Sequence, residues 1–328
     1  MRTRMLSLCA IFVTLLLFSC GKKEGVYNPE RKIIMVETTQ TSIREVRDNP
    51  TDEWVFDDSS RYVTSEMWTW NGDKLMNIRY SSNGGIATND ELLEFEYDGN
   101  RIQRIVERNR GLRVEVRYDG RKVETISMYE RDIEAAKATF SHKRGKVSSI
   151  EEQTLDFLCA KDKELFRRII GMVVDNDPVS ISVENNERFL KNTKSNNYEW
   201  YYEWLDFEWN GDNIEMANYY TGSHDKKYAT YEYDYDDATN PYTGMTYCGF
   251  CGDFGEQSFW LNANNVTRKK TTYSSGETDV QDFTYTYDND WPLSKTNVEV
   301  DSYYHSAFDK YLKVTSTTVT RFTYQDND

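Results

Sequence analysis

The sequence predicts an all-β chain: a long antiparallel meander of tandem hairpins that closes or curls into a barrel or half-barrel. Two observations carry this prediction. Five segments repeat one pattern, in which alternating aromatic or β-branched residues precede a tight polar turn, a polar or basic residue and an aliphatic one. The composition combines a mean hydropathy of −0.78 with 24 Tyr and 8 Trp. That combination suits strands with one apolar and one solvated face.

The repeat hairpins occupy residues 60–153, with a fifth copy further along the chain. Four of the five turns read Asn-Gly or Asp-Gly, and the fourth copy, Lys143-Arg144-Gly145, departs from this. We expect type I′ turns with Asn or Asp and then Gly as the two central residues, because both positions need positive φ. The five segments begin at Trp68, Phe95, Val116, Phe140 and Phe207.

After the turns, aliphatic residues recur three positions apart, as in Leu75 and Ile78 or Ile102 and Ile105. A strand has a side-chain period of two, so this spacing does not fit a regular strand. Each return strand is therefore expected to carry a bulge or to bury part of both faces.

Residues 154–197 interrupt the pattern. Leu155–Leu158 and Glu164–Ile170 have helical spacing, which predicts one or two short helices near 155–172, followed by a loop rich in Asn and Lys. Strand character returns over residues 198–325. The whole chain holds on the order of 15 strands, and open sheets of more than about 10 strands usually curl or close.

The N-terminus carries a targeting signal. Arg2 and Arg4 precede an apolar run that ends at Ser19-Cys20, which resembles a bacterial lipoprotein signal over residues 1–19, cleaved after Ser19. An ordinary secretory signal is the alternative. Acyl chains such as palmitate on Cys20, at about 0.8 kcal/mol per buried CH₂, would give lasting membrane attachment. Residues 20–31 are then a lipidated linker and residues 32–328 a single β-meander domain. This predicts an outer-membrane anchor and leaves open the periplasmic or the surface side.

The Tyr-Asp-Gly turns at Tyr97 and Tyr118, each followed by a basic residue and an aliphatic, look like the tyrosine-aspartate repeats of bacterial surface proteins. Together with the Cys20 signal and the stretch from Tyr231 to Tyr242, they resemble a family of uncharacterised bacterial lipoproteins with a porin-like fold. The resemblance implies a β-barrel-like meander displayed from a membrane anchor. It transfers no catalytic residue.

The densest aromatic cluster lies around residues 198–209. If this segment is a strand, Trp200, Tyr202 and Trp204 share one face and Tyr201 lies on the other. The cluster suits core and cross-strand aromatic pairing. The functional alternative is a stacking platform for a sugar or another flat apolar ligand, or an anchor for a partner protein.

Cys248 and Cys251 form a CxxC pair, which export makes a candidate disulfide, with a redox dithiol or half of a zinc site as alternatives. No second CxxC exists and the three histidines are spread along the chain, so no metal site is expected. The oxygen-rich stretch Asp234–Asn240 suits either calcium or, more simply, a solvated turn.

The net charge of −15 disfavours nucleic acid and anionic lipid headgroups as partners. No nucleophile elbow, zinc-protease motif or phosphate loop is present, and no cofactor is implied. The sequence thus predicts a non-enzymatic, membrane-anchored envelope lipoprotein that binds or scaffolds a glycan, a lipid or an envelope protein. The first alternative is a carrier of a lipid or other apolar ligand in a curved half-barrel. A glycan-active hydrolase is the second.

Overall fold

The computed structural model of the chain describes residues 25–26, 29–82, 91–108, 111–130, 132–155, 200–242, 262–306 and 309–325. The helices expected near 155–172 lie outside these residues. Within the described ranges, no helix is long and apolar enough to cross a membrane. The described strands are β1 (Ile33–Arg47), β2 (Val55–Asn71), β3 (Lys74–Ser82), β4 (Glu91–Asp98), β5 (Arg101–Glu107), β6 (Leu112–Asp119), β7 (Lys122–Glu130), β8 (Ile133–Lys143), β9 (Lys146–Leu155), β10 (Trp200–Asn210), β11 (Asn213–Thr221), β12 (Lys227–Thr239), β13 (Asn264–Tyr273), β14 (Thr278–Asp288), β15 (Trp291–His305) and β16 (Lys310–Tyr324).

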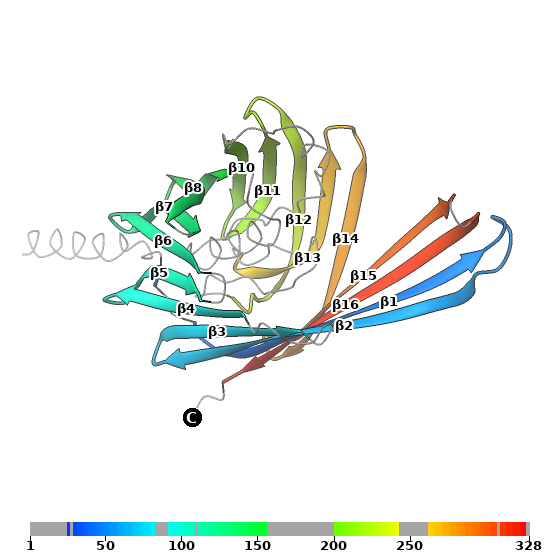
Figure 1. Cartoon of the computed structure of the whole chain (residues 1–328), viewed down its shortest axis with the longest axis horizontal. Helices are drawn as coiled ribbons and strands as arrows, with labels where there is room; N and C mark the ends of the chain where they lie inside the picture. The colour runs from blue at the N-terminus through cyan, green and yellow to red at the C-terminus, as the bar shows by residue number, and fades with distance from the viewer. Residues whose placement is uncertain are drawn as a thin grey trace, which may run out of the picture.

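These strands form one closed antiparallel barrel (Figure 1). Each strand pairs with its neighbours in sequence, and β1 closes the ring against β16, with Ile33 opposite Tyr324 and Arg47 opposite Tyr311. The prediction of an all-β antiparallel meander is confirmed, and the barrel is closed rather than half-open.

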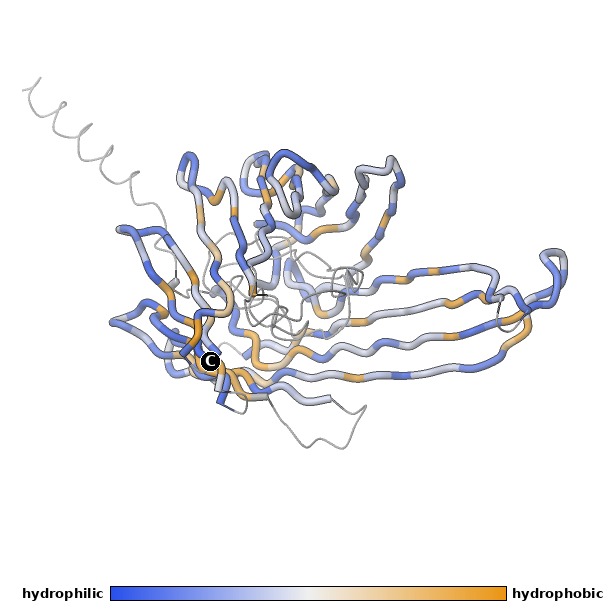
Figure 2. Tube along the Cα trace, turned by 45° about the horizontal axis from the view of Figure 1, so that its top comes forward, coloured by the Kyte–Doolittle hydropathy of each residue, from blue (hydrophilic) through white to orange (hydrophobic). Residues whose placement is uncertain are grey.

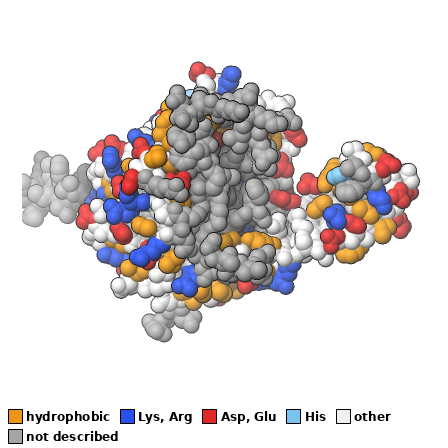
Figure 3. Space-filling view, in the orientation of Figure 1, with side chains coloured by type: hydrophobic (Ala, Val, Ile, Leu, Met, Phe, Trp, Pro, Cys, Tyr) orange, Lys and Arg blue, Asp and Glu red, His pale blue; other side chains and the backbone are white. Residues whose placement is uncertain are grey.

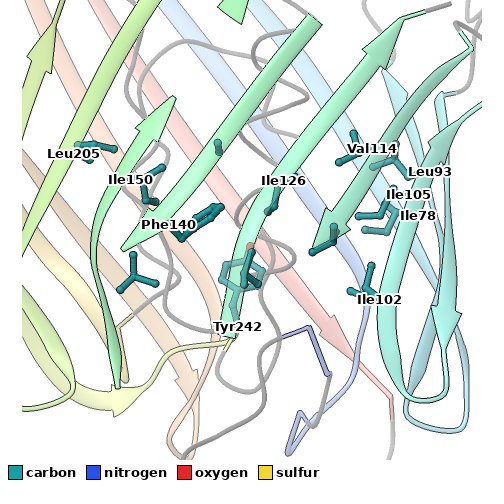
Figure 4. Close-up of a cluster of buried hydrophobic side chains, with 14 of the residues drawn as sticks. Ile78, Leu93, Ile102, Ile105, Val114, Ile126, Phe140, Ile150, Leu205 and Tyr242 are labelled. Atoms are coloured by element: carbon teal, nitrogen blue, oxygen red, sulfur yellow. The ribbon is translucent and has the colours of Figure 1, made fainter. Parts of the chain in front are cut away.

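The interior of the barrel is mainly apolar, with a few charged side chains, Glu66, Glu107, Glu152 and Lys269, buried as well. On β6, Val114 and Val116 are buried. Arg113 and Glu115 alternate with them, point outward and form an ion pair with a nitrogen–oxygen distance of 3.1 Å. Figure 4 shows the buried apolar cluster inside the barrel. Its labelled side chains come from successive strands, from Ile78 on β3 to Leu205 on β10, and Tyr242 lies among them. The space-filling view shows Lys, Arg, Asp and Glu mixed over the outer face of β4 to β7 (Figure 3). A membrane-spanning barrel has the reverse arrangement, with an apolar band outside.

Single-residue bulges explain the three-residue aliphatic spacing. Trp70 pairs with Leu75, but Thr69 pairs with Asn77, so β3 carries one extra residue between them. The shift returns the next aliphatic, Ile78, to the inner face, and both Leu75 and Ile78 are fully buried. The same shift follows the turns at residues 99, 120, 145, 211 and 289, and the expectation of a bulge is confirmed.

The expected turn type is wrong for most hairpins. Asp98 pairs with Arg101, so the central residues are Gly99 and Asn100 rather than Asp98 and Gly99. Gly99 has φ +61°, and no positive φ occurs at Asn100. Glycine in positive φ at the first central position is the signature of a type II′ turn. Only the divergent copy, Arg144-Gly145, has positive φ at both central positions.

A ring of aromatic side chains, here the aromatic girdle, bonds each hairpin to a neighbour at the end of the barrel that carries the two-residue turns. Each side chain donates from its hydroxyl or indole N–H to a backbone carbonyl on an adjacent strand, over 2.5–2.8 Å. Each acceptor carbonyl belongs to one of the first three residues of its strand. The girdle therefore fixes the position of each bonded hairpin along the barrel axis relative to its neighbour. Its members are Trp70, Tyr97, Tyr118, Trp209, Tyr235, Tyr285 and Tyr324.

The basic residue of the repeat reinforces this end of the barrel. Lys74 donates to the carbonyl of Gly99 at 2.6 Å and lies 5.2 Å from the ring centre of Tyr97. Arg101 repeats the arrangement one hairpin later, 2.8 Å from the Gly120 carbonyl and 3.5 Å from the ring centre of Tyr118. The repeat therefore encodes contacts between successive hairpins as well as the turns themselves.

Four strands extend beyond the barrel as a four-stranded sheet, here called the arm. β1, β2, β15 and β16 contain 15 to 17 residues each, and their far halves project to one side (Figure 1, Figure 2). The arm comprises residues 40–47, 55–63, 298–305 and 310–317, where β3 and β14 no longer pair with the outer strands.

Candidate functional site

Strands β10 and β11 carry an aromatic surface on the outer face of the barrel. Leu205 and Phe207 point inward and are buried, so the alternate residues Tyr202 and Trp204 point outward. Tyr220 lies directly opposite Trp204 on β11. Trp200 has the same parity on β10, and we call Trp200, Tyr202, Trp204, Tyr220 and His224 the aromatic platform.

Four rings of the platform, those of Tyr202, Trp204, His224 and Tyr220, form a continuous series of contacts. Tyr202 and Trp204 are stacked, with centroids 6.0 Å apart and planes at 15°. The ring of His224 lies 5.5 Å from that of Trp204 and meets Tyr220 edge-on at 4.6 Å. Tyr202 is 37 % exposed, so a face of the stack remains open to solvent.

The loop between β11 and β12 places the histidine. Gly222 has φ +72°, a conformation that only glycine adopts without strain, and its N–H donates to the carbonyl of Tyr202 at 2.9 Å. Lys226 N–H then bonds Ser223 at 3.0 Å. The loop folds back toward β10 and sets His224 beside Trp204.

Polar side chains border the platform. His224 Nε2 lies 2.9 Å from Asp206 Oδ2, which fixes the imidazole orientation. Gln153, on β9 opposite Tyr202, donates to Glu151 at 2.8 Å. These amide and carboxylate groups offer hydrogen-bond donors and acceptors around the exposed rings.

The local field at the platform is negative. Burial raises the pKa of Tyr220, and the carboxylates of Asp206 and Glu208 raise this pKa further. The arrangement suits an uncharged, hydroxyl-bearing or cationic ligand better than an anion.

The remaining predicted site residues divide into two groups. Ser19, Cys20, Cys248 and Cys251 lie outside the described residues, so lipidation and the disulfide stay predictions. In the Asp234–Asn240 stretch, Asp236 accepts hydrogen bonds from Asn265 on β13 and Tyr287 on β14, and so ties β12 to both of these strands. The described ranges contain no group of His, Cys, Asp or Glu that could hold a metal ion.

Sequence reasoning identified three residues of the platform and missed Tyr220, His224 and the orienting carboxylate Asp206. The signal for Tyr220 was its place beyond the Asn210-Gly211 turn, which sets it opposite Trp204. His224 lies in a loop, and no pattern in the sequence predicts the fold of that loop.

Comparison with known proteins gives a likeness of architecture only. No family model and no curated protein matches the chain. Among solved structures, it is similar to a porin-like protein from Bacteroides uniformis ATCC 8492, with TM-score 0.45 and 12 % identity over 92 % of this chain and 100 % of that one. It is also similar to a porin-like protein from Bacteroides vulgatus ATCC 8482, with TM-score 0.29 and 11 % identity over 74 % of this chain and 96 % of that one.

Proposed function

We propose that this chain is a non-enzymatic lipoprotein of the cell envelope that binds a glycan on its aromatic platform. Acyl chains on Cys20 hold it at the outer membrane, and the linker through residue 31 gives the barrel reach. The barrel acts as a rigid scaffold, because the girdle bonds each hairpin to a neighbour.

The observation that carries this proposal is the stacked pair Tyr202 and Trp204 on the outer face of the barrel, where Tyr202 is 37 % exposed. Stacked rings usually lie in a core, where burial offsets the loss of side-chain freedom. Here they are held in place by neighbours yet open to solvent. The C–H face of a sugar ring fits such a surface, and Asp206, His224 and Gln153 are placed to bond its hydroxyl groups.

The carrier hypothesis depended on an open, concave half-barrel. The strand order closes, and the inner face of β3 to β10 is lined by side chains that pack on one another. The outer platform is therefore the better-supported binding surface.

The test is a glycan array followed by titration of the strongest ligand against wild type, Trp204→Ala and Tyr202→Ala. Each substitution should weaken binding at least tenfold, which is about 1.4 kcal/mol. Phe56→Ala is the matched control, since it removes an aromatic ring that is 62 % exposed on the arm. Binding that is unchanged in Trp204→Ala, or no glycan bound at all, would contradict the proposal.

A further inference from the structure

One edge of the arm is open. β14 pairs with β15 only from Trp291 to Asn297, while β15 continues along β16 to His305. In Figure 1, β14 turns upward with the barrel and β15 runs outward with the arm. Beyond Asn297 no described strand pairs with this edge, although the side chain of Gln281 on β14 still donates to Glu299 at 2.8 Å, and residues 298–304 are all exposed.

The backbone groups that face this edge follow from the register. The N–H of Gln325 donates to the carbonyl of Lys32 at 2.8 Å, so the odd-numbered residues of β16 direct their backbone groups toward β1 and the even-numbered ones direct theirs away from it. Thr320 therefore directs its N–H and C=O to its other partner, Lys295 on β15. Odd-numbered residues of β15 bond β16, and the even-numbered ones face the open edge. Those beyond Asn297 are Val298, Val300, Ser302 and Tyr304.

The opposite edge of the arm carries a bulge that discourages pairing in general, whereas the only such feature of β15 is its acidic side chains, which discourage an acidic partner. On β2, the register shifts beside Asp57, and Arg44 binds both Asp57 at 2.5 Å and Asp58 at 3.7 Å. Bulges of this kind protect sheet edges. The β15–β16 register runs unbroken from Ser294 to His305, and residues 298–304 contain no Pro, Gly or Lys.

We propose that the open edge of β15 binds an extended segment of another polypeptide by strand addition, and that this segment alternates apolar and basic residues. Val298 and Val300 are 54 % and 56 % exposed and share one face, where apolar side chains of an added strand would cover them. Asp301 is exposed on the other face and selects Lys or Arg opposite it.

A second copy of this chain is a poorer occupant. Antiparallel pairing of β15 with itself about Val300 would set acidic residues at 299 and 301 against each other on one face. The net charge of −15 adds repulsion between two copies. The arm thus offers an interaction surface separate from the aromatic platform, and its test does not depend on glycan binding.

The test uses the purified full chain and two labelled ten-residue peptides, one alternating Val with Lys and the other alternating Val with Glu. The Val/Lys peptide should bind, and hydrogen exchange should slow at the amides of Val298, Val300 and Ser302. The Val/Glu peptide should bind at least tenfold more weakly. No binding of the Val/Lys peptide, protection on β2 instead, or a concentration-dependent dimer would overturn the proposal.

Two substitutions at one position isolate the backbone donor. Val300→Pro removes an N–H that faces the open edge, a place where sheets tolerate proline, and should weaken peptide binding at least tenfold. Val300→Thr keeps the N–H and should bind as the wild type does. Equal affinities of these variants would count against strand addition. Asp301→Lys leaves the backbone intact and should reverse the preference between the peptides, so an unchanged preference would also overturn the proposal, even if the proline variant failed to fold.

Discussion

The hydroxyl of Tyr97 donates a 2.7 Å hydrogen bond to the carbonyl oxygen of Leu75, and so joins one hairpin to the return strand of the hairpin before it. Leu75 lies beside a bulge, where the regular ladder between strands is interrupted. The tyrosine thus supplies a bond to a carbonyl at the point where the sheet is irregular. Seven aromatic residues of the girdle make this bond around the barrel.

Removing one girdle hydroxyl should destabilise the barrel. In Tyr97→Phe the ring stays and the Leu75 carbonyl loses its side-chain donor, which costs about 1–3 kcal/mol where the group is buried. Urea unfolding followed by tryptophan fluorescence measures the change in the free energy of unfolding. Tyr304→Phe is the control, because that hydroxyl bonds the exposed Asp309. A midpoint for Tyr97→Phe equal to that of the control would contradict a structural role for the girdle.

A substitution at Arg144 that suits positive φ should raise the free energy of unfolding. Arg144 has φ +55°, in the left-handed region that costs a residue with a Cβ about 1–2 kcal/mol, and asparagine tolerates this region better. We expect Arg144→Asn to raise the free energy of unfolding, and Arg144→Ala to leave it unchanged or lower. Thermal melts of the two variants provide the measurement. A lower melting temperature for the Asn variant than for the Ala variant would contradict the argument from strain.

Alkaline pH should unfold the protein by ionising the buried tyrosines of the girdle. Burial raises the pKa of Tyr97, Tyr235 and Tyr324 well above the ordinary value of 10. Because the folded-state pKa lies above the unfolded one, their contribution to stability is complete below pH 10 and declines as pH rises toward the folded-state pKa. Phenolate absorbance and circular dichroism, recorded together, should show these groups ionising only as the β signal is lost. Full ionisation of all tyrosines in a still-folded barrel would contradict the prediction.

The loop that carries His224 should matter for binding more than for folding. Gly222→Ala places a Cβ at φ +72° with open space around it, so strain of about 1–2 kcal/mol falls on the loop rather than on packing. We expect glycan affinity to fall several-fold as His224 moves from Trp204. Gly276→Ala is the matched control, since Gly276 has φ +88° and equal space in the turn between β13 and β14. Equal glycan affinities in the two variants would show that the loop takes no part in binding.

The sequence was sufficient for the antiparallel meander, because its signals are local, but it left a closed barrel and a half-barrel as alternatives. Alternation placed Val114 and Val116 on the inner face, and the three-residue spacing of Leu75 and Ile78 predicted the bulges that the structure contains. The turn type was wrong because Asp98-Gly99 suits either of two offsets, and the register that decides between them depends on pairing across the whole hairpin.

Features that depend on distant segments were not predictable in this way. The arm requires β1 to pair with β16 from the other end of the chain, and no sequence pattern near Ile33 identifies β16 as its partner. The platform shows both cases: the face shared by Tyr202 and Trp204 follows from strand alternation, whereas the contact of His224 with Trp204 depends on a loop conformation that Gly222 alone does not specify.

We propose above all that this barrel has a mainly apolar interior and that lipid on Cys20 is its membrane anchor. The most direct measurement is the solubility of residues 21–328, produced without detergent and examined by ultracentrifugation and circular dichroism. We expect a folded, β-rich protein that stays in solution as a single species. Well-folded protein that enters solution only with detergent would contradict it.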